Sequence, residues 1–282
     1  MRILVTGANG QLGQDVVKLL STNHEVHGFG REQLDITNES QCFEILEALK
    51  PNVVIHCAAY TAVDLAETEE DMVYKINASG TRNLVVAAER VGTKICYIST
   101  DYVFDGTASM PYREYDNTNP QSVYGKSKRA GEQLVQTLSS RYFIVRTSWV
   151  YGMYGANFVK TMLKIAQDRD NLKVVNDQFG SPTYTVDLAN FLEMLIQTER
   201  YGIYHASNSG VCSWFEFANA IFEESGKKIN VEPCSTEEFP RPAPRPRYSA
   251  MEHLAIRSNG FEDLRSWREG LRAFLNEYRG NE

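Results

Sequence analysis

A tyrosine and a lysine four positions apart, Tyr124 and Lys128, are the first residues whose types and spacing suggest catalysis. On a helix this spacing places both side chains on one face. A phenol ordinarily has a pKa near ~10, and a neighbouring ammonium favours the phenolate and lowers that pKa. The pair therefore predicts an acid that gives a proton to an alkoxide while a hydride reaches the carbonyl carbon. Such a pair is also common on helix surfaces, so other residues must support it.

Support comes from a hydroxyl at the end of an apolar stretch. The segment Ser99-Thr100-Asp101-Tyr102-Val103-Phe104-Asp105-Gly106 begins where the apolar residues 94–99 end. Parallel sheets place their ligands at the carboxyl ends of the strands. We therefore expect Thr100 to hydrogen-bond a substrate carbonyl oxygen beside Tyr124.

Near the N-terminus, glycines directly follow the first apolar stretch, in Gly7-Ala8-Asn9-Gly10-Gln11-Leu12-Gly13. Glycine permits a tight turn and a close approach of backbone to a pyrophosphate, and the N-terminus of the following helix offers N–H groups to the anion. A purely structural strand-to-helix turn is the alternative. In this context we predict a dinucleotide site. Its expected contacts are Gly7, Asn9, Gly10, Gln11, Leu12 and Gly13.

The second apolar stretch ends in Phe29-Gly30-Arg31, and the first acidic residue after it is Glu32. An acidic residue at this point usually binds the ribose 2′-hydroxyl of NAD, whereas an arginine accommodates the 2′-phosphate of NADP. We expect NADP(H), with Arg31 at the phosphate, and leave NAD(H) open. The small residues of Cys57-Ala58-Ala59-Tyr60 should let the cofactor pass close to the third stretch, although core packing also explains the alanines.

These residues can meet only if the fold brings the carboxyl ends of several strands together, and the pattern of apolar residues predicts such a fold. The expected strands are residues 3–6, 25–29, 53–57, 94–99 and 143–147. The expected helices are 11–20, 42–49 and 77–91, and residues 127–138 continue a further helix that begins upstream. Continuously apolar strands separated by helices predict an α/β fold, a Rossmann-type doubly wound parallel sheet. Asn119-Pro120 resembles the N-cap and first position of the helix that carries Tyr124.

The second half of the chain is less regular. Residues 158–166, 186–197, 215–224 and 263–278 predict helices, and 173–175 and 203–205 predict short strands. We expect an NADP-binding domain over residues 1–150, with its core continuing through parts of 151–210, and a smaller C-terminal α+β lobe over 151–282 that mainly binds substrate. Prolines at alternate positions of 240–247 exclude a helix or a central strand there. This stretch is either a solvated linker or an arm that carries arginines over the cleft.

Composition narrows the function classes. The chain has 282 residues, of which 43% are apolar and 23% charged, an ordinary globular balance, and its net charge of −7 disfavours nucleic acid or an acidic membrane as a partner. Five scattered cysteines indicate reduced thiols. Met1-Arg2 leads directly into Ile3-Leu4-Val5, so we expect no signal peptide, and no apolar run approaches the ~20 residues of a membrane span. We expect a cytoplasmic protein, either a monomer or a homodimer.

The glycine spacing GxxGxxG resembles the extended branch of the short-chain dehydrogenase/reductase superfamily, many of whose members act on nucleotide sugars. A narrower resemblance, to the dTDP-4-dehydrorhamnose reductase family, runs through about residue 190 and more loosely to the end. It is carried by 99–106, by Val123-Tyr124-Gly125-Lys126-Ser127-Lys128, by 146–152, by 157–162 and by Asn176-Asp177-Gln178-Phe179-Gly180-Ser181-Pro182-Thr183. It implies NADPH-dependent reduction of the C4 keto group of dTDP-4-dehydro-L-rhamnose to dTDP-L-rhamnose, in polysaccharide biosynthesis.

The resemblance also implies roles for individual residues. The catalytic set is Thr100, Tyr124 and Lys128; Ser99, Tyr124 and Lys128 also belong to the cofactor site, and Asp35 and Ile36 lie beside the adenine. The implied substrate contacts are Thr100, Asp101, Tyr102, Val103, Trp149, Asn157, Arg245 and Arg247. For Trp149 a core aromatic is an equally good explanation from the residue alone.

Two features refine these roles. A related dehydratase would show Asp followed by Glu at this strand end, whereas Asp101 is followed by Tyr102, which favours ketone reduction over elimination of water. Asp101 should accept hydrogen bonds from sugar hydroxyls. Some family members dimerise around magnesium, and Asp15 and Asp187 fall near the corresponding positions. Their spacing is not that of metal ligands, so we expect solvated surface acids and no metal.

Two other functions remain open at this point. One is an epimerase of the same superfamily that keeps its cofactor bound and consumes none. The other is a non-catalytic regulatory subunit with this fold, against which the complete set of Thr100, Tyr124 and Lys128 argues.

Overall fold

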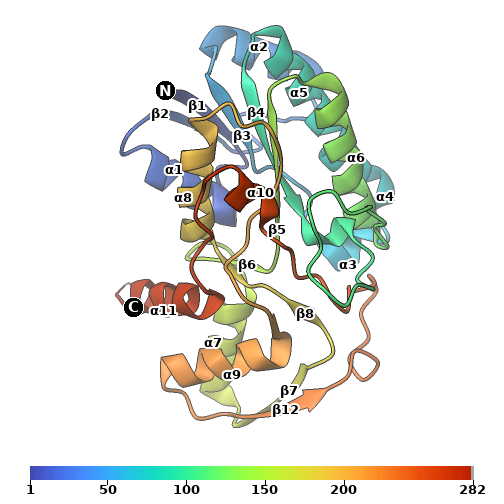
Figure 1. The fold of residues 1–282 in the computed structure, drawn as a ribbon, viewed down its shortest axis with the longest axis vertical. Helices are drawn as coiled ribbons and strands as arrows, with labels where there is room; N and C mark the ends of the chain where they lie inside the picture. The colour runs from blue at the N-terminus through green and yellow to red at the C-terminus, as the bar shows by residue number, and fades with distance from the viewer. Residues whose placement is uncertain (281–282) are drawn as a thin grey trace.

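A parallel sheet of six strands forms the centre of the protein, which we describe over residues 1–280 of a computed structural model (Figure 1). The strand order is β2 (Glu25–Phe29), β1 (Arg2–Thr6), β3 (Val53–His56), β4 (Lys94–Thr100), β5 (Tyr142–Thr147) and β10 (Gly202–His205). The chain passes from β1 to one side and then crosses to the other, so the order reverses between β1 and β3. The predicted doubly wound fold is confirmed, and such a reversal is where these sheets bind ligands.

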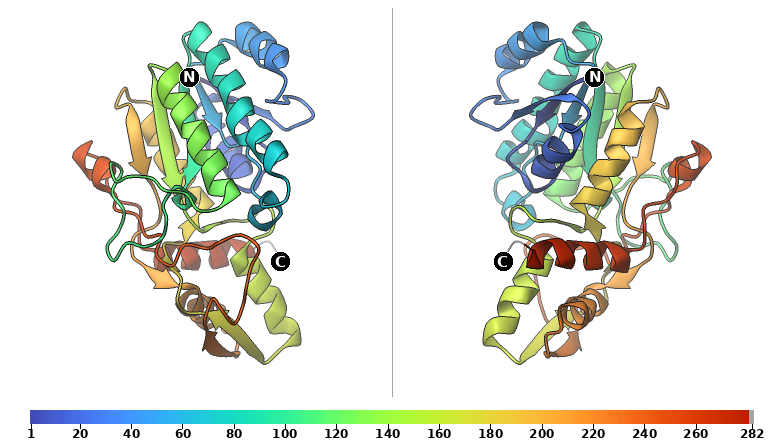
Figure 2. Two further views of the ribbon diagram at one scale, coloured as in Figure 1. Left: turned by 90° about the vertical axis from the view of Figure 1, so that its right-hand side faces the viewer. Right: turned by 90° about the vertical axis from the view of Figure 1, so that its left-hand side faces the viewer.

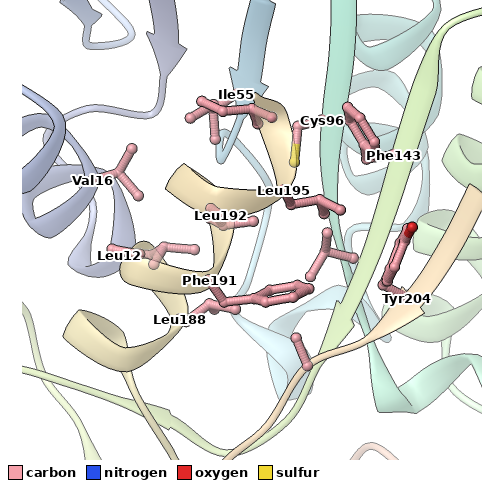
Figure 3. Packing of buried hydrophobic residues seen from close by; sticks show 14 of the residues in the cluster. Leu12, Val16, Ile55, Cys96, Phe143, Leu188, Phe191, Leu192, Leu195 and Tyr204 are labelled. Atoms are coloured by element: carbon pink, nitrogen blue, oxygen red, sulfur yellow. The ribbon is translucent and has the colours of Figure 1, made fainter. Parts of the chain in front are cut away.

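Helices cover both faces of the sheet. Helices α1 (Gln11–Leu20) and α8 (Thr185–Ile196) pack on the face to which Ile3 and Val5 point, and Figure 3 shows Leu12 and Val16 of α1 near Leu188 and Leu192 of α8. Helices α2 (Glu39–Leu49), α5 (Thr81–Arg90) and α6 (Val123–Leu138) pack on the opposite face, which contains Leu4. Burial on both faces explains why the inner strands β1, β3, β4 and β5 are mostly apolar, whereas the edge strand β2, with Glu25 and His27, is only partly buried.

The helix that carries the catalytic pair begins later than predicted. Ser122 is the N-cap of α6, because its hydroxyl accepts the N–H of Gly125 at 3.1 Å. The Asn119-Pro120 prediction is wrong because the Asn119 side chain donates instead to Asp105, at 3.1 Å. Tyr124 is therefore the second residue of the helix, with Lys128 one turn later on the same face.

The predicted helix over 77–91 is divided into two forms of helix. The short helices α3 (Val63–Ala66) and α4 (Glu70–Tyr74) lead into a π-helical turn, η1 (Lys75–Gly80), and α5 follows directly. Such π turns concentrate at functional sites. Here the turn places Asn77 so that its amide accepts the N–H of Tyr60 at 2.7 Å and donates to Ser127 of α6 at 2.9 Å. This fixes the chain after β3 against the catalytic helix.

A second lobe lies beyond the end of the sheet to which β5 runs (Figures 1 and 2). Helices α7 (Phe158–Asp168), α9 (Trp214–Ser225) and α11 (Trp267–Arg279) enclose its core, which includes Phe217 and Phe274. This lobe also contains three two-stranded sheets. They pair β7 (Asn171–Val175) with β12 (Asn230–Cys234), β8 (Phe179–Gly180) with β11 (Cys212–Ser213), and β6 (Val150–Tyr151) with β9 (Thr183–Tyr184). The remaining elements are the 3-10 turn η2 (Asp101–Val103) and α10 (Leu254–Ser258). None of the helices in residues 1–280 has the length and apolar character of a membrane span.

Candidate active site

A cavity of about 970 Å³ extends across the carboxyl ends of β1, β3, β4 and β5. Its wall contains all of the predicted cofactor residues, from the glycine turn to Lys128, together with Thr100, Asp101, Tyr102 and Trp149 of the predicted substrate set. The cavity spans the reversal of strand order between β1 and β3, where the fold class predicts a ligand. The residues singled out by chemistry are therefore brought together at one place.

The glycine turn leaves no room for side chains. Gly7 has a φ of +65°, and a Cβ there would lie 2.7 Å from the backbone nitrogen of Ala58. A Cβ on Gly13 would lie 2.2 Å from the Gly7 carbonyl oxygen. Helix α1 then begins at an N-cap, Gly10, that supplies no side-chain cap. Its first N–H groups are the donors that a pyrophosphate requires, so this turn fits a dinucleotide.

Beyond the turn, residues 30–37 form the end of the cavity expected to hold adenosine. Arg31 is exposed at the rim, and the side chain of Ile36 is buried. The Asp35 carboxylate accepts the N–H and hydroxyl of Thr37 at 3.0 and 2.8 Å. Burial raises the pKa of Asp35, but the bonds from Thr37 and the charge of Arg31 outweigh it and leave the pKa below its ordinary value. Arg31 and Asp35 thus face the cavity as charged groups.

The catalytic set lies on two neighbouring elements. Thr100 ends β4 and caps η2, since its hydroxyl accepts the N–H of Tyr102 at 3.2 Å and donates to Asp101 at 3.0 Å. Tyr124 and Lys128 face the same cavity from α6. The Lys128 ammonium donates to the Ile98 carbonyl at 2.7 Å and lies 4.0 Å from the ring centroid of Tyr97.

Burial controls the acidity of this pair. It raises the pKa of Tyr124 to about 12, although hydrogen bonding with Thr100 acts in the opposite direction. Our expectation that the ammonium lowers the phenol pKa is wrong for this structure, because burial dominates. Burial also lowers the pKa of Lys128 to about 7, with the charge of Glu132 opposing it. Tyr124 is therefore a fully protonated acid at neutral pH, beside an amine that exchanges its proton in that range.

A buried ion pair that the sequence pattern did not predict lies behind the catalytic residues. Glu132 of α6 accepts Nε and Nη2 of Arg146 in β5 at 2.8 and 2.9 Å, and the hydroxyl of Ser99 in β4 at 2.6 Å. Both charged side chains are almost completely buried. The bidentate geometry fixes α6 against the two strands. It thereby sets the position of Lys128, one turn before Glu132, relative to Thr100.

Two polar atoms in the cavity wall make no hydrogen bond of ordinary geometry in residues 1–280, Oδ2 of Asp101 and Oγ1 of Thr147, although the Ser249 hydroxyl lies near enough to stabilise the Asp101 carboxylate. Asp101 is only 2% exposed, and burial raises its pKa to about 6. Thr147 ends β5 opposite Thr100 and was not among the predicted contacts, although its place at a strand end was a usable signal. Buried polar groups of this kind require hydrogen bonds. Both residues are thus suited to a polar ligand.

Trp149 lies in the cavity wall and adopts an unusual backbone conformation. Its φ is +47°, in the left-handed region that residues with a Cβ rarely adopt. Its indole stacks on that of Trp214, with ring centroids 3.6 Å apart and planes inclined by 8°. Trp149 is therefore an aromatic surface in the cavity, and strain of this kind concentrates at functional sites.

Four predicted substrate contacts do not line the cavity. Val103 is completely buried beside Phe104. Asn157 caps α7 and donates to the Gln11 side chain at 2.9 Å, while Gln11 donates to the Val150 carbonyl at 3.0 Å. Asn157 therefore connects the second lobe to the glycine turn.

The other two are Arg245 and Arg247, which belong to the proline-rich segment 240–247 and differ in their contacts. Arg245 pairs with Asp64 at 2.9 Å, and its guanidinium lies 5.9 Å from the ring centroid of Tyr102. Arg247 is exposed. The segment is thus not a free linker, because Asp64 of α3 holds Arg245 beside Tyr102 of the cavity wall, as the alternative of an arm with arginines requires.

The acids considered for magnesium are not solvated. Asp15 is buried and accepts the hydroxyl of Thr185, and burial raises its pKa. Asp187 pairs with Arg265 at 2.6 Å and accepts the Asn208 amide at 2.7 Å. Our expectation of surface acids is wrong, because each carboxylate packs where α8 meets another helix or the loop before α11. In residues 1–280 no group of three or more His, Cys, Asp or Glu side chains is placed to hold a metal ion.

Comparison with known proteins decides the family. The family described as the RmlD substrate binding domain matches residues 1–280. The chain is 44% identical to a dTDP-4-dehydrorhamnose reductase of Aggregatibacter actinomycetemcomitans, over 96% of this chain and 97% of that protein. The chain belongs to the dTDP-4-dehydrorhamnose reductase family. The chain also resembles the spore coat polysaccharide biosynthesis protein SpsK of Bacillus subtilis, at 45% identity over 98% of this chain and 97% of that one.

A solved structure of the same reductase family agrees along the whole fold. The dTDP-4-dehydrorhamnose reductase of Bacillus anthracis, crystallised in complex with NADP, superposes with a TM-score of 0.96 at 51% identity, covering 98% of this chain and 99% of that one. The NADP in that relative agrees with the dinucleotide site predicted here from the glycine turn. The family resemblance carried by the five sequence segments is confirmed.

Proposed function

We propose that this chain uses NADPH to reduce the C4 keto group of dTDP-4-dehydro-L-rhamnose, giving dTDP-L-rhamnose. The observation that carries the proposal is the presence of Thr100, Tyr124 and Lys128 in one cavity with a glycine turn suited to a dinucleotide. The names of the relatives support the substrate, and the NADP in the Bacillus anthracis structure supports the cofactor. A regulatory subunit would have no need of this convergence.

Each residue then has a defined task. NADPH, when bound, supplies the hydride. The Thr100 hydroxyl holds the carbonyl oxygen, and the phenol of Tyr124 gives its proton to that oxygen as negative charge develops there. Lys128, held by the Ile98 carbonyl, returns a proton to the phenol through its own titration near neutral pH. The free oxygen of Asp101 accepts a sugar hydroxyl.

The second lobe completes the proposal. We assign residues 1–150 mainly to the cofactor and 151–282 mainly to the nucleotide sugar, with Trp149 at the boundary between them. Thr147 joins Asp101 as a substrate or cofactor contact, because its hydroxyl is buried in the wall without a partner in residues 1–280. A cytoplasmic location and a monomeric or homodimeric state stay predictions.

The direct test is oxidation of NADPH, followed by its absorbance, with a panel of nucleotide-linked 4-keto sugars. We expect turnover with the dTDP-linked sugar and a loss of about 10²-fold or more in Tyr124→Phe, with NADPH affinity retained. Near-normal turnover of that variant would exclude the proposed proton donor. An epimerase would instead convert the sugar without net loss of NADPH. NADH, run in parallel with Arg31→Ala, tests the role of Arg31 at the 2′-phosphate.

A further inference from the structure

Two tryptophans of the second lobe, Trp214 and Trp267, have different surroundings. Trp214 packs on a residue of the cavity wall, whereas Trp267 packs in the core of the lobe. Trp214 and Trp267 each begin a helix, α9 and α11, after a serine that forms a capping box with a glutamate. Trp267 packs edge-on against Phe217 in the lobe core, at 5.8 Å. Trp214 instead stacks face to face on Trp149, and only Trp149 lines the cavity.

The backbone alone would not hold Trp149 in this place. A φ of +47° is unfavourable for a residue with a Cβ, so surrounding contacts must maintain it. The carbonyl of Trp149 accepts the N–H of Thr183 at 3.2 Å, which fixes the main chain to β9. The indole is fixed separately, by Trp214 on its face and by Gly180 of β8.

Gly180 contributes by having no side chain. A Cβ at this position would lie 2.6 Å from Cε2 of Trp149, closer than any real contact. The indole therefore occupies a slot between the Trp214 ring and the backbone of β8. Trp214 is itself fixed, because Phe158 of α7 packs on it at 4.6 Å and the buried Ser213 caps its helix. The slot is thus made from α7, α9 and β8.

We propose that Trp214, with Gly180, is a positioning residue that sets the angle of the Trp149 indole against the sugar nucleotide, and so determines substrate affinity without touching substrate or cofactor. The proposal rests on the proposed function for its substrate. It predicts an effect on the KM for the nucleotide sugar, because Trp149 lies at the boundary with the second lobe. Binding of NADPH at the glycine turn is unaffected.

Steady-state kinetics test the proposal with matched variants. In Trp214→Ala we expect the KM for the keto sugar to rise about fivefold to tenfold, the range that the loss of an aromatic stack supports, with an unchanged Kd for NADPH. Trp214→Phe keeps a flat ring and should restore most of the affinity. Gly180→Ala, which disturbs the slot from its other side, should raise KM as well. Trp267→Ala is the control, with a KM near that of the wild type.

Circular dichroism provides a readout that does not depend on turnover. The stacked indoles couple excitonically, so we expect the wild type to show an exciton couplet that disappears in both Trp149→Phe and Trp214→Phe and persists in Trp267→Phe. A folded Trp214→Ala protein that lacks the couplet but keeps the KM of Trp267→Ala would overturn the proposal. If Trp214→Ala does not fold, Gly180→Ala decides it by the same comparison, because this variant is expected to raise KM relative to Trp267→Ala. If instead the wild type does not reduce the dTDP sugar, the substrate assignment fails, while titration of the couplet with dTDP still tests whether this slot faces the ligand.

Discussion

Replacing Asp101 by Asn should make the protein more stable and a poorer enzyme. In the native structure, burial raises the Asp101 pKa from 3.8 to about 6, because hydrogen bonding from Ser249 and Thr100 offsets only part of the loss of solvent. The charge is thus held at a cost that the unfolded chain does not have. A change from 3.8 to about 6 corresponds to about 3 kcal/mol at pH 7. The amide of Asn has nearly the same shape and carries no charge into this buried place, so we expect a net gain of about 1–3 kcal/mol.

The sign of the pH dependence makes this prediction specific. Because the native pKa is raised, the folded protein holds a proton between pH 3.8 and about 6 that the unfolded chain has lost, so this group makes stability fall as pH rises through that window. The advantage of Asp101→Asn should therefore be full at about pH 7.5 and smaller at about pH 5. Urea denaturation of both proteins at the two pH values measures it. An Asn variant that is less stable than the wild type at the higher pH, with the same dependence on urea, would refute the reasoning.

The same substitution should weaken substrate binding. A hydrogen bond from a sugar hydroxyl to a carboxylate contributes about 1.5–3 kcal/mol, which corresponds to a rise of about tenfold to a hundredfold in KM for the keto sugar. The Kd for NADPH should not change, because the free oxygen of Asp101 is assigned to the sugar. An unchanged KM would remove Asp101 from the substrate site. Gained stability together with lost affinity would show that the buried charge is retained for function.

Three further predictions concern other parts of the site. Since burial lowers the Lys128 pKa to about 7, its charge is present below that pH and lost above it, and kcat/KM should decline as pH rises through neutrality; a flat profile to about pH 9 would contradict this. Gly7→Ala places a methyl group 2.7 Å from the Ala58 nitrogen at a φ of +65°, so NADPH affinity measured by fluorescence titration should fall at least about tenfold. Glu132→Gln leaves Arg146 buried without its charge partner and should cost about 3–5 kcal/mol in the free energy of unfolding, measured with denaturant; a loss below about 1 kcal/mol would show that the pair is dispensable.

The sheet and the glycine turn could be predicted because their signals are local. Strands β1, β3, β4 and β5 are short, mostly apolar runs, and the structure places these and β2 within one or two residues of their expected ranges. The start of α6 could not be placed in this way, because Asn119 looks like a cap but its side chain is used by Asp105, which no local pattern reveals. In the second lobe, strands of two residues such as β8 and β11 show no periodicity, so their pairing was not predictable.

In the candidate site, too, residues with a local sequence signal were predictable, and residues that depend on contacts between distant segments were not. Thr100, Tyr124 and Lys128 were found from spacing and strand ends, and the structure brings them into one cavity. Glu132 and Arg146 were missed because charged residues are usually exposed, and only their pairing across two elements permits burial. The effect of burial on the Tyr124 pKa was also inaccessible, since it depends on packing rather than on the neighbouring ammonium.

The amide of Gln11 has a consequence for how new specificities can arise in this family. It belongs to the turn suited to the dinucleotide phosphates, yet it contacts Val150, the last residue of the first domain, and Asn157 of the second lobe. A lobe transplanted from another reductase would keep the contact with the Gln11 side chain only if it also presented an amide at the place of Asn157. Substrate range can therefore change through loops of the lobe that lie away from Gln11. The contacts of Gln11 with Val150 and Asn157 restrict which lobes can be exchanged.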